Sequence, residues 1–398
     1  MNVLIVDDDA SALGLLKNQL MRLDCHNVSV CDRAQDAMAL MWPDGAGVDL
    51  VFCDLQMPEV DGVEFVRYLG RIGYRGHLVL ISAEDPRVLQ TVERLALAHD
   101  IPVLAAVEKP VPLMSLQQLL NRHAERLTML ERPARARYSA DELRAALLDD
   151  ELIIHVQPKV RLSDGELVGV EALVRWRHPR DGLVYPDQFV ATAEQHGLID
   201  TLTRRVLTLS LQANAAWHRA GALIGMAVNV SMENLAALTF PDDVMTLLRD
   251  AGVPSTQLTL EVTESRLMPD ALKALDILTR LRLKRIRLAI DDFGTGYSSL
   301  AQLRDVPFDE LKLDRSFVHG AVHRPDLGAI VGNTLAMARE LGLGSVAEGV
   351  ETRADWDHVR SLGCDVAQGY FIARPMAPAD LASWRAEWKC RREEERLC

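Results

Sequence analysis

The stretch Val3-Leu4-Ile5-Val6-Asp7-Asp8 runs from four apolar residues directly into two carboxylates. A buried parallel strand is apolar on both faces and carries its functional side chains at its carboxyl end. Three later apolar runs also end at a polar residue, and helical periodicity appears between the runs. These runs are Leu50–Cys53, Leu78–Ile81 and Val103–Val107, and the helical segments include Ala12–Leu23 and Val63–Leu69. Residues 1–122 are therefore predicted to form a doubly wound α/β domain.

The composition of the chain limits its size class and its partners. Its 398 residues correspond to two or three domains, and 48% of them are hydrophobic, as in a globular protein. A net charge of -13 argues against DNA and anionic membranes as partners. No apolar run approaches the length of a membrane span, which is roughly 18 residues. The cysteines form no C-x-x-C pair and no basic segment precedes the first apolar run, so we expect a cytoplasmic location.

A second α/β pattern follows a charged stretch at residues 123–137, which we interpret as a linker. Residues 138–398 repeat a strand-then-helix order over a length typical of one TIM-like (β/α)8 barrel. The predicted strands are Leu167–Val174, Ala227–Val230, Leu258–Val262, Leu288–Ile290, Glu310–Leu313, Ser345–Ala347 and Asp365–Ala367. The predicted helices include Ala271–Arg282 and Asp326–Leu341.

Polar side chains at the strand ends of the first domain point to phosphoryl chemistry. Asp7, Asp8 and Asp54 would share one sheet edge, where three carboxylates can hold Mg²⁺. The metal would neutralise a phosphoryl group on Asp54. Lys109 would pair with the phosphoryl oxygens, and Ser82 would offer a hydroxyl.

This half of the chain resembles the receiver domain of two-component response regulators. The stretches that carry the resemblance are Ile5-Val-Asp-Asp-Asp9, Cys53-Asp-Leu-Gln-Met-Pro-Glu-Val-Asp-Gly62, Ile81-Ser-Ala83 and Glu108-Lys-Pro110. The resemblance implies that Asp54 accepts a phosphoryl group from a sensor histidine kinase, beside one Mg²⁺ at Asp7 and Asp8. It also implies a switch role for Ser82, a conserved-type lysine at Lys109, and a cis bond before Pro110.

One position departs from the receiver pattern. The family usually carries Tyr or Phe three residues before the lysine, and here that residue is Ala106. An aromatic switch cannot operate at that position, which leaves the sign of phosphorylation control open. Phosphorylation could still shift a dimer contact, or the receiver could be a constitutive dimerisation module.

The second domain places carboxylates, amides and one lysine at its strand ends. These residues are Glu171, Asn229, Glu261, Glu264, Asp291, Asp292, Lys312, Asp314, Glu348, Glu351 and Gln368. The carboxyl ends of barrel strands share one mouth. That mouth would collect five of the carboxylates, namely Glu171, Glu261, Asp291, Asp292 and Glu348. Five carboxylates this close together repel one another, so either some hold protons or divalent cations compensate them. An all-oxygen set favours Mg²⁺ or Mn²⁺, and two such ions about 3.5–4 Å apart can activate water for phosphoryl displacement.

Residues 138–376 resemble the EAL domain, the family of cyclic di-GMP-specific phosphodiesterases. The supporting motifs are Gln157-Pro158, Glu171-Ala-Leu-Val-Arg175-Trp, Asn229-Val-Ser, Glu261-Val-Thr-Glu264, Asp291-Asp-Phe-Gly-Thr-Gly296, Leu311-Lys-Leu-Asp314, Glu348-Gly-Val-Glu351 and Gln368-Gly-Tyr370. The resemblance implies a metal-dependent hydrolase that opens cyclic di-GMP to linear 5'-pGpG on a variant (β/α)8 barrel.

The resemblance also assigns roles to individual residues. It makes Glu171, Asn229, Glu261 and Asp291 ligands of a first metal, and Asp291 and Asp292 ligands of a second. Lys312 would contact the attacking water, and Glu348 and Gln368 would complete the metal and water shell. Gln157, Arg175 and Asp314 would meet the substrate, with Arg175 at a phosphate. Glu264 would anchor the loop 293–299, which links the site to a dimer interface in this family. Tyr370 and Phe371 are equally consistent with a guanine contact and with packing.

Two classes of function remain in competition. The first is an enzyme: a homo-oligomeric response regulator that hydrolyses cyclic di-GMP. The second is a catalytically silent cyclic di-GMP receptor that acts through protein contacts. The complete acid set favours the enzyme, because a receptor does not need the ligands of a second metal.

Overall fold

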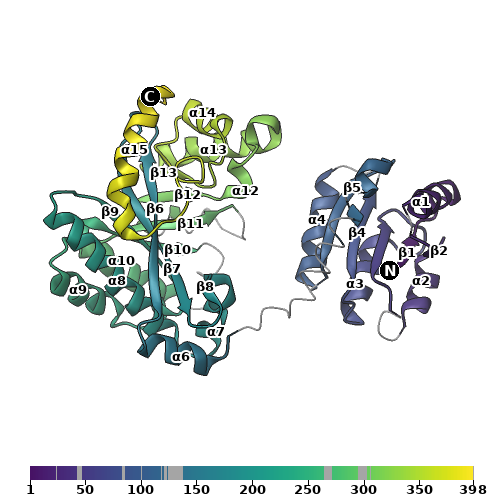
Figure 1. The fold of residues 1–398 in the computed structure, drawn as a ribbon, viewed down its shortest axis with the longest axis horizontal. Helices are drawn as coiled ribbons and strands as arrows, with labels where there is room; N and C mark the ends of the chain where they lie inside the picture. Colours follow the sequence, from purple (N-terminus) through teal and green to yellow (C-terminus); the bar gives the residue numbers. More distant parts are fainter. Residues whose placement is uncertain are drawn as a thin grey trace. The chain divides into compact units, whose positions relative to one another are not determined.

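The computed structural model describes residues 1–23, 25–42, 47–82, 86–99, 101–117, 119–120, 123, 138–263, 271–294, 303–304 and 306–397. The chain divides into two compact units, Met1–Ala136 and Arg137–Cys398 (Figure 1). Within the described ranges, no helix has both the length and the apolar character that crossing a membrane would require.

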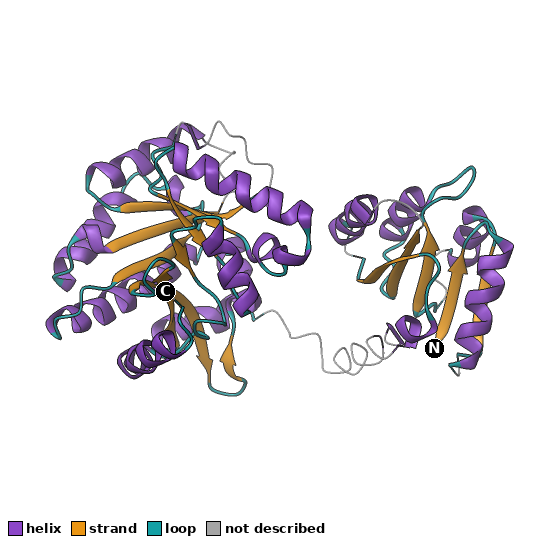
Figure 2. Cartoon of the chain, turned by 90° about the horizontal axis from the view of Figure 1, so that it is seen from above, coloured by secondary structure: helices purple, strands orange, loops and turns teal. Residues whose placement is uncertain are grey.

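The N-terminal unit is built on a parallel sheet. Within its described residues, five strands lie in the order β2-β1-β3-β4-β5, and the helices flank them (Figure 2). The strands are β1 Asn2–Val6, β2 Asn27–Cys31, β3 Leu50–Asp54, β4 His77–Ser82 and β5 Val103–Glu108. The helices include α1 Ala10–Arg22, α2 Ala34–Met41, α3 Gly62–Arg71 and α4 Pro86–Ala98. This arrangement confirms the predicted doubly wound α/β class.

Alternate residues of each central strand pack on opposite faces of this sheet. Val3 and Ile5 of β1 belong to a hydrophobic cluster with α1, whereas Leu4 and Val6 belong to a second cluster with α2, α3 and α4. Continuous apolar runs are therefore needed in the central strands. The edge strand β2 lies outside the predicted set because only Cys31 of its five residues is buried, so it has no such run.

The C-terminal unit is a closed barrel of eight strands, counted over the described residues. The order β6-β14-β13-β12-β11-β10-β9-β7 is closed by pairing of β6 with β7, and β8 extends β7 as a short hairpin. The strands are β6 Leu152–Arg161, β7 Leu167–His178, β8 Gly182–Val184, β9 Gly225–Val230, β10 Leu258–Thr263, β11 Arg287–Phe293, β12 Glu310–Leu313, β13 Gly344–Ala347 and β14 Val366–Ala367. The predicted TIM-like barrel is confirmed.

Helices surround the barrel strands (Figure 2). The α-helices are α6 Ala140–Leu148, α7 Val190–Gln195, α8 Ile199–Arg219, α9 Phe240–Ala251, α10 Ala271–Leu283, α12 Arg315–Val318, α13 Pro325–Glu340, α14 Arg353–Ser361 and α15 Leu381–Glu394. The short 3-10 helices are η1 Pro186–Gln188, η2 Asn234–Ala236, η3 Ser255–Gln257, η5 Ala321–His323 and η6 Pro378–Asp380. Their apolar faces and the strands share one hydrophobic core, which contains Trp176, Phe189 and Trp356.

Strand β6 breaks the simple strand-then-helix repeat that the sequence predicted. It runs antiparallel to both of its neighbours, β7 and β14, so the barrel begins with a hairpin. This strand was missed because the polar residues His155, Gln157 and Lys159 alternate with its apolar ones. Gln157 and Lys159 are nonetheless buried, so β6 contributes polar groups to the barrel.

Candidate functional sites

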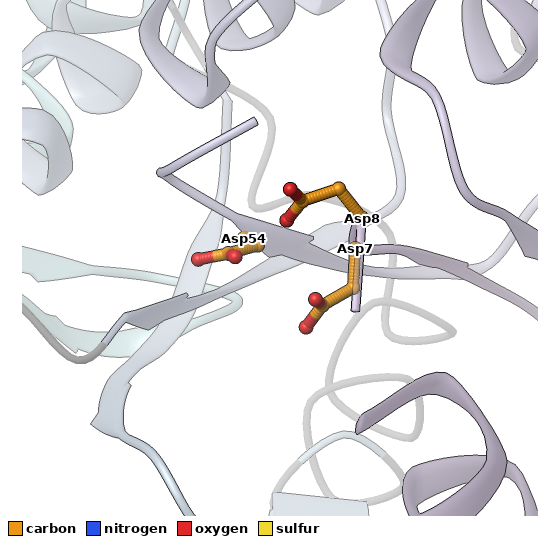
Figure 3. Close-up of side chains that lie close together, drawn as sticks. All are labelled: Asp7, Asp8 and Asp54. Carbon is orange, nitrogen blue, oxygen red and sulfur yellow. The ribbon is translucent and has the colours of Figure 1, made fainter. Parts of the chain in front are cut away.

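The first site lies at the carboxyl edge of the N-terminal sheet. Asp7 follows β1, Asp54 ends β3 and Lys109 follows β5. The Lys109 Nζ atom lies 2.7 Å from an oxygen of Asp7 and 2.7 Å from an oxygen of Asp54. Asp7 and Asp54 are buried and Asp8 is exposed, and one oxygen from each of the three lies within 4.8 Å of the others (Figure 3).

The electrostatics of this cluster fit a divalent cation. Burial raises the pKa of Asp54 even though the Lys109 ammonium acts in the opposite direction. Three carboxylates face one ammonium, so negative charge is in excess. Oxygen ligands of this kind suit Mg²⁺.

The remaining predicted residues of the first site lie beside this cluster. Ser82 is buried at the end of β4, and its carbonyl accepts a hydrogen bond of 2.9 Å from the Lys109 amide. The Lys109–Pro110 bond is cis. Ala106 packs against the second hydrophobic cluster as a partly buried residue.

The second site is centred on Lys312 at the carboxyl ends of the barrel strands. The Lys312 side chain is 1% exposed, and four carboxylates surround its ammonium. The distances from Nζ are 2.7 Å to Glu261, 2.8 Å to Asp291, 2.7 Å to Glu348 and 3.9 Å to Glu171. These acids come from β7, β10 and β11 and from the residue after β13, so closure of the barrel brings them together.

Two amides hold the Glu171 carboxylate between them. Asn229 Nδ2 donates to one Glu171 oxygen at 2.7 Å, and Gln368 Nε2 donates to the other at 2.6 Å. Gln368 Nε2 also donates to Gln157 Oε1 at 3.0 Å. This leaves the carbonyl oxygens of Asn229 and Gln368 as potential ligands, and within the described part of the chain the buried Gln368 Oε1 accepts no hydrogen bond.

Burial and the excess of negative charge raise the pKa values of several acids of this site. Burial and the neighbouring carboxylates raise the pKa of Glu348 to about 8, although Lys312 opposes the shift. Burial and Asp291 raise the pKa of Asp292 to about 6. Burial also raises the pKa of Glu171.

The pKa of Glu261 is shifted in the opposite direction. Burial acts to raise its pKa, but the ammonium groups of Lys159 and Lys312 outweigh burial and lower the pKa to about 2. The two ammonium groups therefore favour the ionised form of this buried carboxylate.

The donor set of the second site fits divalent metal ions. Asp291, Asp292 and Glu348 each offer an oxygen within 4.8 Å of the others, and Glu171, Asn229 and Gln368 border them. Oxygen donors with surplus negative charge suit Mg²⁺ or Mn²⁺. Asp292 adopts a left-handed backbone with φ of 54°, which is uncommon for a residue other than glycine and often marks functional positions.

A cavity of about 280 Å³ opens above these acids. Its walls include Glu171, Asp291, Lys312, Glu348, Gln368 and Tyr370. Tyr370 is 49% exposed, and the Arg374 guanidinium lies 4.4 Å from its ring centroid. Phe371 instead packs against the hydrophobic core. The structure thus separates the two aromatic residues: Phe371 packs, whereas Tyr370 is open to a ligand.

Arg175, the predicted phosphate contact, is buried and is not among the residues that line this cavity. Its NH1 group donates to the Val174 carbonyl at 2.8 Å, and the Tyr185 ring centroid lies 4.9 Å from its guanidinium. Among the residues that the structure describes, no carboxylate forms an ion pair with Arg175, and its Nε has no hydrogen-bond partner. The guanidinium therefore keeps hydrogen-bonding capacity for an anionic ligand.

Two other predicted residues have a local role or lie outside the described structure. Asp314 caps helix α12 and accepts hydrogen bonds from the Ser316 amide at 2.9 Å and the Ser316 hydroxyl at 2.5 Å. Its contact with substrate stays a prediction. Glu264 and residues 295–299 of the predicted loop lie outside the described residues.

Lys159 and Glu310 are two buried residues beside the site that sequence reasoning missed. Lys159 Nζ lies 2.6 Å from Glu261 and 3.3 Å from Glu310. A signal was available, because Gln157 and Lys159 alternate on one face of a strand, as do Glu310 and Lys312. Polar residues at this spacing in a buried strand indicate a charged interior.

Comparison with known proteins decides the family. The EAL domain profile matches residues 140–375, and the response regulator receiver domain profile matches residues 3–121. The chain belongs to the response regulators that carry an EAL domain. Both halves of this EAL-domain response regulator match one relative, the cyclic di-GMP phosphodiesterase RocR of Pseudomonas aeruginosa. The two are 33% identical over 380 residues, which cover 94% of this chain and 96% of RocR.

The EAL domain has further similar relatives. It is 43% identical over 266 residues to the cyclic di-GMP phosphodiesterase NbdA of Pseudomonas aeruginosa, covering 67% of this chain but only 33% of NbdA. Among solved structures, it is similar to the PaMucR phosphodiesterase in complex with c-di-GMP, with 42% identity and a TM-score of 0.58. That match covers 61% of this chain and 98% of the solved chain. The EAL domain of this response regulator is thus homologous to cyclic di-GMP phosphodiesterases.

Proposed function

We propose that this response regulator hydrolyses cyclic di-GMP to linear 5'-pGpG with two Mg²⁺ or Mn²⁺ ions, and that phosphorylation of Asp54 modulates the reaction. The names of RocR, NbdA and MucR support the substrate. One observation of the site carries the reaction type. Four carboxylates converge on the buried Lys312 ammonium, and this excess of negative charge needs divalent cations before it can accept a phosphodiester.

The residues divide into groups by what they would hold. Glu171, Asn229, Glu261 and Asp291 would hold the first ion, Asp291 and Asp292 the second, and Glu348 and Gln368 would complete the shell. Divalent ions bound there would lower the pKa of a water and stabilise charge on the phosphoryl oxygens.

The protein side chains supply orientation and charge. Burial opposes protonation of Lys312, but the surrounding carboxylates outweigh it and raise the pKa of Lys312 well above its usual value. Lys312 would therefore stay an ammonium and donate hydrogen bonds to the attacking water rather than remove its proton. Asn229 and Gln368 would keep Glu171 in place, and Arg175 would bind a substrate phosphate with its planar guanidinium.

The test is hydrolysis of cyclic di-GMP with Mg²⁺ or Mn²⁺, comparing wild type with Glu171→Ala. Glu166→Ala is the matched control, because Glu166 immediately precedes β7 while Glu171 lies within it. We expect pGpG from the wild type and from Glu166→Ala, and turnover near background from Glu171→Ala. Tight nucleotide binding without turnover in either metal would instead establish the catalytically silent receptor.

The receiver domain would control this activity. The cluster of Asp7, Asp8, Asp54 and Lys109 supports phosphoryl transfer to Asp54 from a sensor histidine kinase, beside one Mg²⁺. We propose that the signal reaches the EAL domain through contacts within a homo-oligomer, because Ala106 offers no aromatic ring to move. Beryllofluoride, a phosphate mimic, should change turnover or oligomeric state, and no change in either would leave the receiver as an inert dimerisation module.

A further inference from the structure

The interior of the EAL barrel contains a column of alternating charges. Barrels of this class are usually filled by layers of branched apolar side chains. Here the side chains of Glu310, Lys159, Glu261 and Lys312 follow one another, with exposed fractions of 11%, 6%, 0% and 1%. Lys159 lies between Glu310 and Glu261, and Glu261 is one of the acids of the proposed metal site.

Lys159 and Lys312 bind different oxygens of the same carboxylate. Lys159 Nζ lies 2.6 Å from Glu261 Oε1, and Lys312 Nζ lies 2.7 Å from Glu261 Oε2. The Glu261 carboxylate is thereby held at both oxygens. Glu310 holds Lys159 from the other side, with Oε1 at 3.3 Å from Nζ.

We propose that Lys159 is a positioning residue for the metal site: it binds Glu261 Oε1, so that Oε2 is directed to the mouth of the barrel. This inference rests on the proposed function, in which Glu261 is a ligand of the first metal. Lys159 belongs to β6, the strand that runs antiparallel to its neighbours, so the hairpin that starts the barrel would have a direct part in building the site.

The sign of the change in metal affinity on replacing Lys159 distinguishes a positioning role from a purely electrostatic one. Lys159 brings a positive charge close to a cation site, so Coulomb repulsion by itself predicts that its removal strengthens metal binding. If Lys159 instead orients Glu261, its removal frees one carboxylate oxygen and weakens metal binding. Residues that orient metal ligands typically change metal affinity by about 10–100-fold when replaced.

The experiment measures Mn²⁺ binding to the full-length protein by calorimetry without nucleotide. Every protein carries Asp8→Asn, so that the receiver cluster does not contribute a second class of metal site. We expect Lys159→Met to raise the Kd for Mn²⁺ by about 10–100-fold at unchanged stoichiometry. Saturating Mn²⁺ should then restore most of kcat with the KM for cyclic di-GMP unaltered.

Two variants serve as controls. Lys159→Arg keeps the positive charge and should restore part of the affinity. Glu310→Gln removes one of the two ionic partners of Lys159 but leaves the contact between Lys159 and Glu261, so the rise in Kd should be smaller. If Lys159→Met does not fold, Lys159→Gln, which keeps a hydrogen-bond donor, is assessed by the same Kd and stoichiometry.

Equal or tighter Mn²⁺ binding in the Lys159 variant would overturn the inference. So would a lower stoichiometry at an unchanged Kd, because that would mean that Lys159 only supports folding. A wild-type EAL site that binds no Mn²⁺ at all is a different failure, because it would refute the metal assignment of the proposed function itself.

Discussion

The receiver domain and the EAL domain both place a lysine ammonium among carboxylates at the ends of parallel strands, but they expose it differently. The Lys109 side chain is 23% exposed and contacts two aspartates, whereas the Lys312 side chain is 1% exposed and contacts four acids. An open sheet leaves its edge in solvent, while a closed barrel surrounds its site and lowers the local dielectric. The same chemical motif therefore gives an accessible acceptor in one domain and an enclosed, strongly charged site in the other.

The largest expected effect concerns the enclosed lysine. Lys312→Met should lower kcat for cyclic di-GMP by about 100–1,000-fold, because it removes a preorganised charge from the reacting centre. Steady-state rates at saturating Mn²⁺ would check this prediction. Lys389→Met, a change on the outer helix α15, is the matched control. A rate within a few-fold of wild type would contradict the proposed contact with the attacking water.

Stability tests the comparison between the two lysines directly. Lys312→Met should destabilise the EAL domain by about 3–5 kcal/mol, because it leaves several buried carboxylates without their shared cation. Lys109→Met should cost the receiver about 1 kcal/mol or less, because its site is closer to solvent. Calorimetric unfolding of the full chain in EDTA would measure both. Equal losses of unfolding free energy in the two variants would show that closure of the barrel does not make Lys312 more important for stability than Lys109.

Metal removal should have the next largest effect. Free Mn²⁺ at 100 times its Kd should stabilise the EAL domain by about 2.7 kcal/mol for each ion relative to EDTA. The physical reason is that an ion that binds only the folded site shifts the unfolding equilibrium by mass action. Asp8→Asn should abolish the Mn²⁺-dependent shift of the receiver transition and leave the EAL transition unchanged. If Asp8→Asn instead left the shift of the receiver transition intact, the cluster of Asp7, Asp8 and Asp54 would not be the site at which Mn²⁺ stabilises the receiver.

The smallest expected effect concerns Asp54 in the receiver domain. Asp54→Asn should abolish any response of turnover to beryllofluoride while the basal rate stays near the wild-type value, because Asp54 lies outside the EAL domain. Asp32→Asn, an exposed acid after β2, should keep the response. A response that persists in Asp54→Asn would place the acceptor elsewhere.

Much of the molecule follows from local sequence patterns. Continuous apolar runs that end in Asp7, Asp54 or Asp291 predict buried parallel strands, and such strands bring their carboxyl ends to a common edge. That rule is independent of tertiary detail, which is why both folds and the two acidic clusters were predictable. The edge strand β2 and the antiparallel strand β6 were not, because polar residues interrupt their apolar runs.

By itself, the sequence determined the fold class and the acids Asp7, Asp54, Asp291 and Asp292 that lie at the strand ends, but not Glu310. Only the tertiary structure decided which charge neutralises which. Lys159 and Glu261 are 102 residues apart, and the different environments of Tyr370 and Phe371 depend on neighbours from other elements. Local periodicity specifies the face on which a side chain lies, whereas ion pairing and burial depend on closure of the barrel and on residues far apart in the chain.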